Sequence, residues 1–441
     1  MRTKKKRKVR LNLKRFLPFI LILAVLIVGL VLGIKKLASK PENPTGDPGK
    51  KQEEPQPKQP EYSTITIRCI GDVMAHLDQI KSAKMEDGTY DFSDSFMYVK
   101  EYLSEADLSL ANIETTFSGD GSYSGYPAFD APDALAKNVK DAGIDVALFA
   151  NNHMLDTKLD GAKRTVQVLR DAGLTVVGAR TSTDETRSQI VNVKGVKLGI
   201  VAYTYETDMV KGKRTLNGSS SSGMDGAADF INTFRYYKIE QDQKAIADEI
   251  AWCKANGADV VVCYLHWGNE YKQTPSKNDK ALAKYLAENG ADIIFASHPH
   301  VLQPFENIEL GTFEEVKTSD GAVEVVAHSK KVPVFYSMGN FISNQRTETL
   351  SSNQGKETAA KTEQGIIAEV KLTVCLDDGS FVIDGTDYIP TWVDRYKEGD
   401  TFEYRVIPLT NGFEKNETLK LSGHLDRAKE ALKAINETVG N

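Results

Sequence analysis

The chain has 441 residues and 41% hydrophobic content, so it can bury a large core and is not a small protein held together by disulfides. Its formal net charge is -6, but residues 1–40 carry twelve Lys and Arg and no acid, and the rest combines 61 acidic with 43 basic residues, a formal charge of -18. Such an acidic surface repels phosphate backbones, which argues against nucleic acid as a partner.

The amino-terminal segment predicts a membrane anchor. Residues 1–15 are strongly basic, and residues 16–34 are uncharged and apolar over nineteen positions, a length that spans a bilayer. The basic run also resembles a nuclear import signal, but a basic flank beside a span fits the positive-inside rule better. We therefore expect a cytoplasmic segment at 1–15, an uncleaved signal anchor at 16–34 that crosses the cell membrane once, and an extracellular folded body.

Residues 35–61 predict a disordered, Pro-rich linker. Six prolines lie between Pro41 and Pro60, with Gly, Gln, Lys and Glu around them, and no apolar residue there is able to build a core. The linker would hold a folded domain, residues 62–441, away from the membrane.

From Thr64 onward, predicted strands and helices alternate, which is typical of parallel β-α-β units. The first strands are expected at 64–70, 107–111 and 145–150, followed by helices at 93–104, 132–142 and 161–172 respectively. Further strands are expected at 198–203, 259–265 and 292–296, a Gly/Ser-rich loop at 217–226, and helices at 238–255 and 277–289.

The pattern changes after residue 296, where strands with short turns predict antiparallel pairing. These strands are expected at 305–310, 322–328, 332–337, 365–375 and 380–389, before a last amphipathic helix at 424–435. The fold class is therefore α/β with an antiparallel part (α+β). The four cysteines lie far apart in apolar runs, which predicts buried packing residues, although a disulfide stays open.

Histidines concentrate at the ends of the predicted strands. Five of the seven follow a strand directly: His76, His153, His266, His298 and His300. Polar groups at the carboxyl ends of parallel strands meet in one crevice, so this concentration predicts a shared site. His328 and His424 have no such context, and we interpret them as structural or exposed.

The pair His298 and His300 is spaced like a metal site. Residues at i and i+2 in extended backbone point the same way, and Pro299 between them restricts the turn. Taken alone, two ordinary surface histidines beside a proline explain this stretch equally well.

The other strand ends add ligand types that favour a metal. Gly71 allows a sharp turn before the hard carboxylate of Asp72, and an amide and a carboxylate follow the second strand. The third strand is followed by an amide, an imidazole and a carboxylate within six residues, and a carboxylate comes four residues after His266. In order, these additional candidates are Asn112, Glu114, Asn152, Asp156, Glu270 and Asn340.

These stretches, in this order, resemble the CapA family, which is associated with poly-γ-glutamate capsule synthesis and is similar to calcineurin-like metallophosphoesterases. The resemblance covers roughly residues 64–341. The motifs that carry it are Gly-Asp-Val-Met, Asn-Ile-Glu, Ala-Asn-Asn-His-Met-Leu-Asp, His-Trp-Gly-Asn-Glu-Tyr, His-Pro-His-Val-Leu-Gln and Ser-Met-Gly-Asn-Phe. It implies a four-layer αββα metallophosphoesterase-like sandwich with a divalent metal centre.

The same resemblance implies residue roles. The implied metal ligands are Asp72, Glu114 (or Asn112 in its place), Asn152, His266, His298 and His300. His153 would be the acid beside the substrate, and we group Asp156 and Glu270 with it as catalytic residues. We expect substrate contacts from Asn112, His76 and Asn340.

This chain departs from the phosphoesterase pattern, which has Asp-x-His where Asp72, Val73 and Met74 stand. Met is a soft ligand and a poor substitute for imidazole on a hard ion. We therefore expect one or two ions of Mn, Mg, Zn or Fe, with one position weak, unless His76 supplies the missing imidazole.

Two functions remain open at this point. The first is a metal-dependent hydrolase outside the cell that cleaves a phosphoester or an amide of a cell-envelope polymer, with poly-γ-glutamate as the candidate. The second is a non-catalytic component of capsule assembly or export, anchored beside the membrane proteins of a capsule synthase. The acidic body would repel an anionic polymer unless divalent cations or a local basic patch offset the charge.

Overall fold

The structure is a computed structural model that describes residues 59–218, 223–317 and 323–440. Pro60–Asn441 form one compact unit. The predicted cytoplasmic segment (1–15), the transmembrane anchor (16–34) and nearly all of the linker (35–61) lie outside the described residues and stay predictions, as does part of the predicted loop at 217–226. Among the described helices, none combines the length and apolar character needed to cross a membrane.

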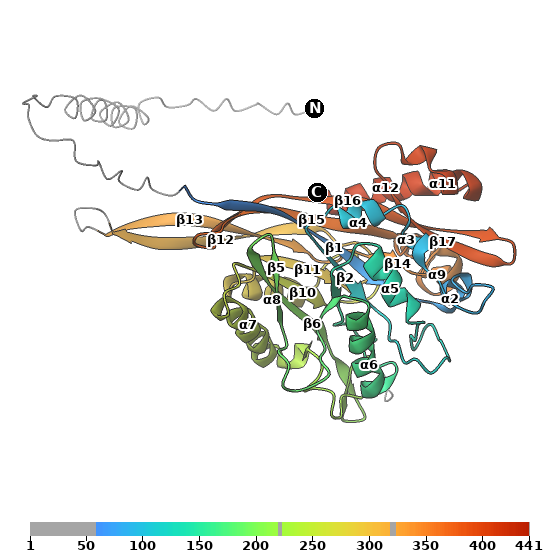
Figure 1. Ribbon diagram of the computed structural model, residues 1–441, viewed down its shortest axis with the longest axis horizontal. Coiled ribbons are helices and arrows are strands. Elements are labelled where there is room, and N and C mark those ends of the chain that lie inside the picture. The colour runs from blue at the N-terminus through green and yellow to red at the C-terminus, as the bar shows by residue number, and fades with distance from the viewer. Residues whose placement is uncertain (1–58, 219–222, 318–322, 441) are drawn as a thin grey trace, which may run out of the picture. The chain divides into compact units, whose positions relative to one another are not determined.

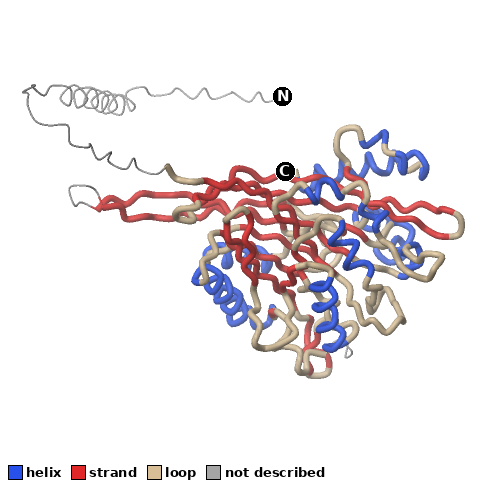
Figure 2. The backbone as a smooth tube through the Cα atoms, viewed as in Figure 1, coloured by secondary structure: helices blue, strands red, loops and turns tan. Residues whose placement is uncertain are grey.

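Two mixed β-sheets form the middle of this unit (Figure 1, Figure 2). The first sheet has the spatial order β17 (Thr401–Pro408), β16 (Phe381–Glu398), β15 (Gln364–Cys375), β1 (Tyr62–Val73), β2 (Leu108–Ile113), β3 (Val146–Leu148) and β4 (Thr175–Val177), and β14 (Asn340–Ile342) also pairs with β1. The second has the order β12 (Phe305–Lys317), β13 (Val323–Phe335), β11 (Ile293–Ser297), β10 (Val260–His266), β6 (Val196–Tyr205) and β5 (Gln189–Val193), with β9 (Thr233–Phe234) on β6. Strands β7 (Thr207–Val210) and β8 (Lys213–Thr215) form a separate pair.

The strand directions confirm the predicted α/β class. Strands β1 to β4 run parallel, as do β6, β10, β11 and β13. The antiparallel pairs involve mainly the later part of the chain, in β12 with β13 and in β15, β16 and β17. The carboxyl ends of the parallel strands are therefore grouped within each sheet.

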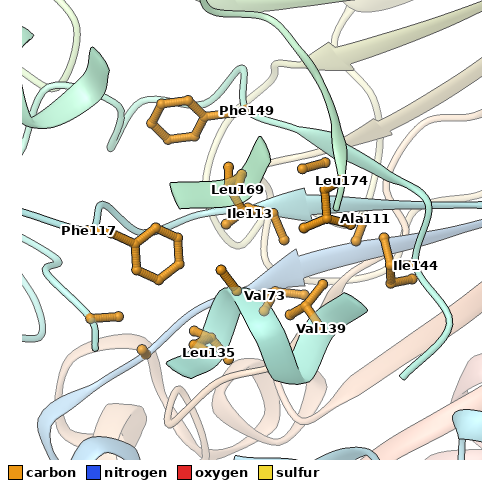
Figure 3. Packing of buried hydrophobic residues seen from close by; sticks show 14 of the residues in the cluster. Val73, Ala111, Ile113, Phe117, Leu135, Val139, Ile144, Phe149, Leu169 and Leu174 are labelled. Atoms are coloured by element: carbon orange, nitrogen blue, oxygen red, sulfur yellow. The ribbon is translucent and has the colours of Figure 1, made fainter. Parts of the chain in front are cut away.

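Helices cover the outer face of each sheet, which gives four layers. The first sheet carries α2 (Leu77–Ser82), α3 (Ser93–Phe96), α4 (Lys100–Ser104), α5 (Ala134–Asp141) and α6 (Lys158–Asp171), and the second carries α7 (Ile239–Ala255) and α8 (Lys277–Glu288). Figure 3 shows Val73 and Ile113 of the first sheet in one buried cluster with Leu135 of α5 and Leu169 of α6. This core fixes the strands whose ends carry the candidate residues.

A separate apolar core lies between the two sheets. Side chains such as Ile67 and Leu110 of the first sheet belong to one buried cluster with Ile200 and Val262 of the second. The helices α11 (Glu417–Ser422) and α12 (Leu425–Val439) contact β16, and α9 (Thr347–Gln354) and α10 (Lys356–Lys361) follow β14. All four cysteines are buried and free, which confirms their prediction as packing residues.

Three local predictions are wrong. The helix expected at 93–104 is split into α3 and α4, because the N–H groups of Met97 and Val99 bond to carbonyls three residues back, in tighter turns than an α-helix allows. The strands expected at 322–328 and 332–337 form one strand, β13, because Lys330, which we expected in a turn between them, pairs with β12. Residue 322 lies outside the described part. Strand β16 continues to Glu398 because the unpredicted β17 pairs with its second half.

Gly71 is required by the close approach of β1 and the segment before β14. A Cβ on Gly71 would lie 1.9 Å from the carbonyl oxygen of Gly339, which accepts from Asp72 N–H at 3.1 Å. We expect Gly71→Ala to destabilise the chain by about 1–3 kcal/mol and to lower its Tm in a circular dichroism melt. Gly385→Ala in β16 is the matched control, since its Cβ would meet no described atom within 4 Å. Equal Tm values for the two variants would contradict this reading of Gly71.

Candidate metal centre

The register of the first sheet places buried polar side chains next to one another. Asp72 in β1 lies opposite Asn112 of β2 and Asn340 of β14, and Glu114 follows β2 directly. Asn112 Nδ2 donates to Asp72 Oδ1 at 2.8 Å and to Glu114 Oε2 at 3.0 Å. All four side chains are buried. Asn112 thus holds two carboxylates close together away from water.

Three histidines from the second sheet reach the same place. His266 ends β10, and His298 and His300 follow the neighbouring strand β11. His300 Nδ1 lies 3.0 Å from Asp72 Oδ2, and His266 Nε2 lies 2.9 Å from Asn152 Oδ1. The ring of His298 lies near both of the others, with centroid distances of 4.9 Å to His266 and 5.8 Å to His300. The strand ends of both sheets therefore meet in one cluster.

Backbone strain is concentrated at this cluster. Among the described residues, six other than glycine have positive φ, and three of them are Tyr271 (62°), His298 (102°) and His300 (56°). Tyr271 N–H donates to the carbonyl of Pro299 at 2.8 Å, which ties the loop after β10 to the turn that carries both histidines. Such conformations cost about 1–3 kcal/mol each and persist where the surroundings over-determine them. The orientation of the two imidazoles is thus maintained at a cost in stability, as is typical of functional sites.

The buried surroundings favour neutral imidazoles at His266 and His298 and the neutral form of Glu114. Burial, followed by the proximity of the other histidines, holds the pKa of His266 and of His298 well below the ordinary value. Burial, together with the charge of Asp72, raises the pKa of Glu114. Burial opposes protonation of His300 as well, but the hydrogen bond and charge of Asp72 outweigh it and raise the pKa of His300. Neutral imidazoles offer the lone pairs that a metal ion needs.

Two buried atoms in the cluster have no hydrogen-bond partner in the described part of the chain, Glu114 Oε1 and His298 Nδ1. Glu114 Oε1 lies 3.8 Å from His266 Nε2 and 3.9 Å from His300 Nε2. These distances are too long for hydrogen bonds. They are compatible with ligands on one ion, because two bonds of about 2.1 Å allow ligand atoms to lie up to about 4.2 Å apart. The residues present therefore fit a divalent metal.

Two sets of side chains have ligand atoms within 4.8 Å of one another. The sets are Asp72, Glu114 and His266, and Glu270, His298 and His300. Carboxylate oxygen and imidazole nitrogen are ligands that suit Mn, Fe and Zn. Glu270, which we predicted as catalytic, is exposed and belongs to the same set as the predicted ligands His298 and His300. The predicted ligand Asn152 contacts His266. The individual roles stay predictions.

His153 lies beside this cluster and is held by Asp156. His153 Nδ1 is 2.7 Å from Asp156 Oδ2, and both side chains are nearly fully buried. Because an ionised carboxylate only accepts, Nδ1 carries the proton and donates to Asp156, which leaves Nε2 for a substrate atom. The amide of Asn217 lies at 3.4 Å from the same Nδ1, a weaker contact. The structure thus orients the imidazole that we predicted as the acid.

His76 and Asn340 lie at the edge of the cluster. Asn340 Oδ1 is 3.1 Å from His300 Nδ1. His76 Nδ1 accepts from the backbone N–H of Asn344 at 3.2 Å, and its ring packs edge-on against Phe129. Burial is the main reason that the pKa of His76 falls to about 4. His76 is in neither of the two ligand sets found among the described residues, and its predicted substrate contact stays a prediction.

Sequence reasoning missed three polar neighbours of the cluster. Tyr205 OH lies 3.0 Å from His298 Nε2, and Tyr264 OH lies 3.2 Å from His266 Nδ1. Asn151 Nδ2 donates to Asn112 Oδ1 at 3.2 Å. Tyr264 was recognisable, since it precedes His266 by two positions in one strand and shares its face. For Tyr205 the sequence shows only a position near a strand end.

Comparison with known families gives a match over this region. A family model described as "Bacterial capsule synthesis protein PGA_cap" matches residues 66–345, which include every candidate ligand. The chain is 29% identical over 296 residues to the "Capsule biosynthesis protein CapA" of Bacillus anthracis, across 65% of this chain and 62% of that protein. It is 26% identical over 302 residues to the "PGA biosynthesis protein CapA" of Bacillus subtilis (strain 168), across 67% of each chain. The first match thus spans less than two thirds of the relative.

Two solved structures show a weak likeness. One is a phosphatase from Mycoplasma pneumoniae, at 13% identity and a TM-score of 0.40, across 75% of this chain and 94% of that chain. The other is a 5'-nucleotidase from Candida albicans SC5314, at 11% identity and a TM-score of 0.34, across 84% of this chain and 56% of that chain. At TM-scores below 0.5, neither likeness bears on the fold or function of this chain.

Proposed function

The chain belongs to the bacterial capsule synthesis protein family PGA_cap, and on that premise we propose that it is a metal-dependent hydrolase of a cell-envelope polymer. The proposed location is the cell membrane, with residues 16–34 as a single span and the folded unit outside the cell. Poly-γ-glutamate is the proposed polymer, in line with relatives named for capsule and PGA biosynthesis. The membrane proteins of the capsule synthase are the proposed partners.

One observation supports a metal site above the others. A buried carboxylate oxygen of Glu114 has no hydrogen-bond partner in the described part of the chain and faces nitrogens of His266 and His300. Leaving a buried carboxylate oxygen unpaired costs free energy, and a cation between these three groups would remove that cost. We propose that Asp72, Glu114 and the three histidines hold one or two divalent ions.

The proposed chemistry divides between the ion and the protein. A bound divalent ion would polarise the scissile group and lower the pKa of a bound water toward neutral. His153, fixed through Nδ1 by Asp156, would deliver a proton from Nε2 to the leaving group, and the carboxylate would stabilise the charged imidazole. A relation to calcineurin-like metallophosphoesterases is part of this proposal.

A metal-loading and substrate experiment tests the hydrolase. We expect the purified full-length chain, loaded with Mn²⁺ or Zn²⁺, to hydrolyse a phosphoester or a γ-glutamyl amide, and EDTA to abolish the activity. Metal content is measured on the same sample. A chain that holds metal but turns over neither class of substrate would favour the second candidate function.

That second candidate is a non-catalytic component of capsule assembly or export beside a polymer synthase. The observation in its favour is Met74, which is buried two residues after Asp72. In the phosphoesterase pattern an imidazole stands there, and a thioether is a poor ligand for a hard ion. Such a centre, with one position weakened, would bind a metal or an anionic group without efficient catalysis.

The proposed anchoring has its own test. Protease added to intact cells should release a fragment that begins within residues 41–60, because the basic residues that precede the span would stay in the cytoplasm. The released fragment is identified by its amino-terminal sequence. Protection of the folded unit until the cells are lysed would contradict an extracellular location.

A further inference from the structure

A cavity of about 470 Å³ lies directly beside the candidate metal centre. We call it the tyrosine cavity; it is lined by Tyr205, Glu206, Asp208, Tyr236, Tyr237 and Asn269, among others. Asn269 directly precedes Glu270, and the hydroxyl of Tyr205 lies 3.0 Å from His298 Nε2. Tyr205 therefore both lines the cavity and contacts a histidine of the cluster. None of the residues described above as ligands or catalytic groups lines it.

The charged groups that line this cavity are acidic. Glu206 is buried, and its carboxylate is paired with Arg214 and accepts from the hydroxyl of Thr233 at 2.6 Å. Asp208 is exposed. Among the described residues, no Lys or Arg lines the cavity. Because Arg214 pairs with Glu206, the remaining charge at the lining is the exposed carboxylate of Asp208, which would attract a cation and repel a carboxylate or phosphate.

Two of the three tyrosine rings that line the cavity, Tyr236 and Tyr205, are held in place before any ligand arrives. Tyr236 OH donates to the buried Asp279 at 2.6 Å and accepts from Gly268 N–H at 3.1 Å. The ring of Tyr205 lies 4.8 Å from the ring of His298. Fixed rings lose little conformational freedom on binding, which favours affinity for a small ligand.

The ring of Tyr237 already has one cation of the chain beside it. The guanidinium of Arg235 lies 6.0 Å from its ring centroid, while the same guanidinium donates to Asp242 at 2.7 Å. The side chain of Tyr237 is nevertheless 44% exposed, and that of Met209, which also lines the cavity, is 54% exposed. Rings and carboxylates that surround a space are the arrangement that binds ammonium groups.

We propose that the tyrosine cavity binds a positively charged amine on the substrate of the proposed hydrolase. The link to a substrate rests on that proposed function, whereas the binding of an amine does not. An anionic polymer would then have to enter the metal centre from another side, with only an amine-bearing part seated between Tyr205 and Asp208.

Binding of small probes to the metal-free, full-length chain tests this directly. We expect n-butylammonium to bind at least about tenfold more tightly than butyrate or glucose, as measured by ligand-observed NMR titration. Tyr237→Ala and Asp208→Asn should each weaken n-butylammonium binding by about five- to tenfold, within the range of a cation–π contact or a single charge. The matched controls are Tyr62→Ala, 63% exposed at the start of β1, and Asp400→Asn in the exposed turn between β16 and β17, and both should bind as the parent does.

Other results overturn the amine site. If glucose binds as tightly as n-butylammonium, the cavity is a site for a neutral sugar. If butyrate binds as tightly as n-butylammonium, the cavity does not repel anions, and the proposed amine site is wrong. Variants of Tyr237 and Asp208 that bind like the controls would place the amine elsewhere. Because these measurements use no metal and no turnover, they stand whether or not the chain proves to be a hydrolase.

Discussion

Replacing His298 with alanine should abolish tight binding of a divalent metal by the full-length chain. His298 belongs to one candidate set of ligands, with His300, and its ring lies 4.9 Å from that of His266 in the other set. Its Nδ1 is one of the buried atoms without a hydrogen-bond partner in the described residues. Loss of a group that merely orients a ligand typically costs 10–100-fold in metal affinity, so loss of a direct ligand should cost about 100-fold or more.

The control for this change is His76→Ala. His76 is also a histidine beside the cluster, but it is in neither set found among the described residues, and its Nδ1 is occupied by the N–H of Asn344. We expect His76→Ala to keep at least one equivalent of metal by mass spectrometry after loading and gel filtration, with circular dichroism to show that both variants are folded. Unchanged metal content in His298→Ala would remove the basis for a hydrolase, and the capsule-assembly role would become our interpretation.

The sequence was informative at the strand ends because the signal there is local. A buried strand followed at once by a histidine can be recognised in a few residues, and parallel strands bring their carboxyl ends together. This is why His266, His298 and His300 were predicted to share a site although β10 and β11 are separate strands, and the structure does bring them together. Asp72 was predicted with them although it precedes His266 by 194 residues and His300 by 228.

What could not be predicted depends on contacts between distant segments. Lys330 lies in a polar run that is typical of a turn, but β12 pairs with that run and Asp292 accepts from the ammonium group. The hydroxyl of Tyr205 reaches His298 only because β6 and β11 flank β10 in one sheet. Likewise, no local pattern shows that one oxygen of Glu114 is left without a partner in the described residues.

Changing His153 to asparagine should lower kcat for the hydrolysed substrate by about 10²–10⁴-fold, the usual contribution of a general acid. Metal content should not change, because His153 is in neither set of ligands found in the described part of the chain. Asp156→Asn should also lower kcat, since an uncharged amide still accepts from the N–H of Phe129 but no longer stabilises a charged imidazole. The measurement is kcat and metal content on the same preparations.

A second histidine of this chain provides a matched control for that prediction. His424 Nδ1 lies 2.7 Å from Asp394 Oδ1, the same separation as between His153 and Asp156, but His424 lies between α11 and α12 and Asp394 lies in β16. His424→Asn therefore removes an equivalent contact outside the cluster and should leave kcat and metal content as in the parent chain. If His153→Asn and His424→Asn reduce kcat equally, the loss reflects stability alone, and His153 does not deliver the proton. If only His153→Asn reduces kcat while the metal stays bound, the imidazole acts on the substrate through Nε2, the nitrogen that Asp156 leaves available.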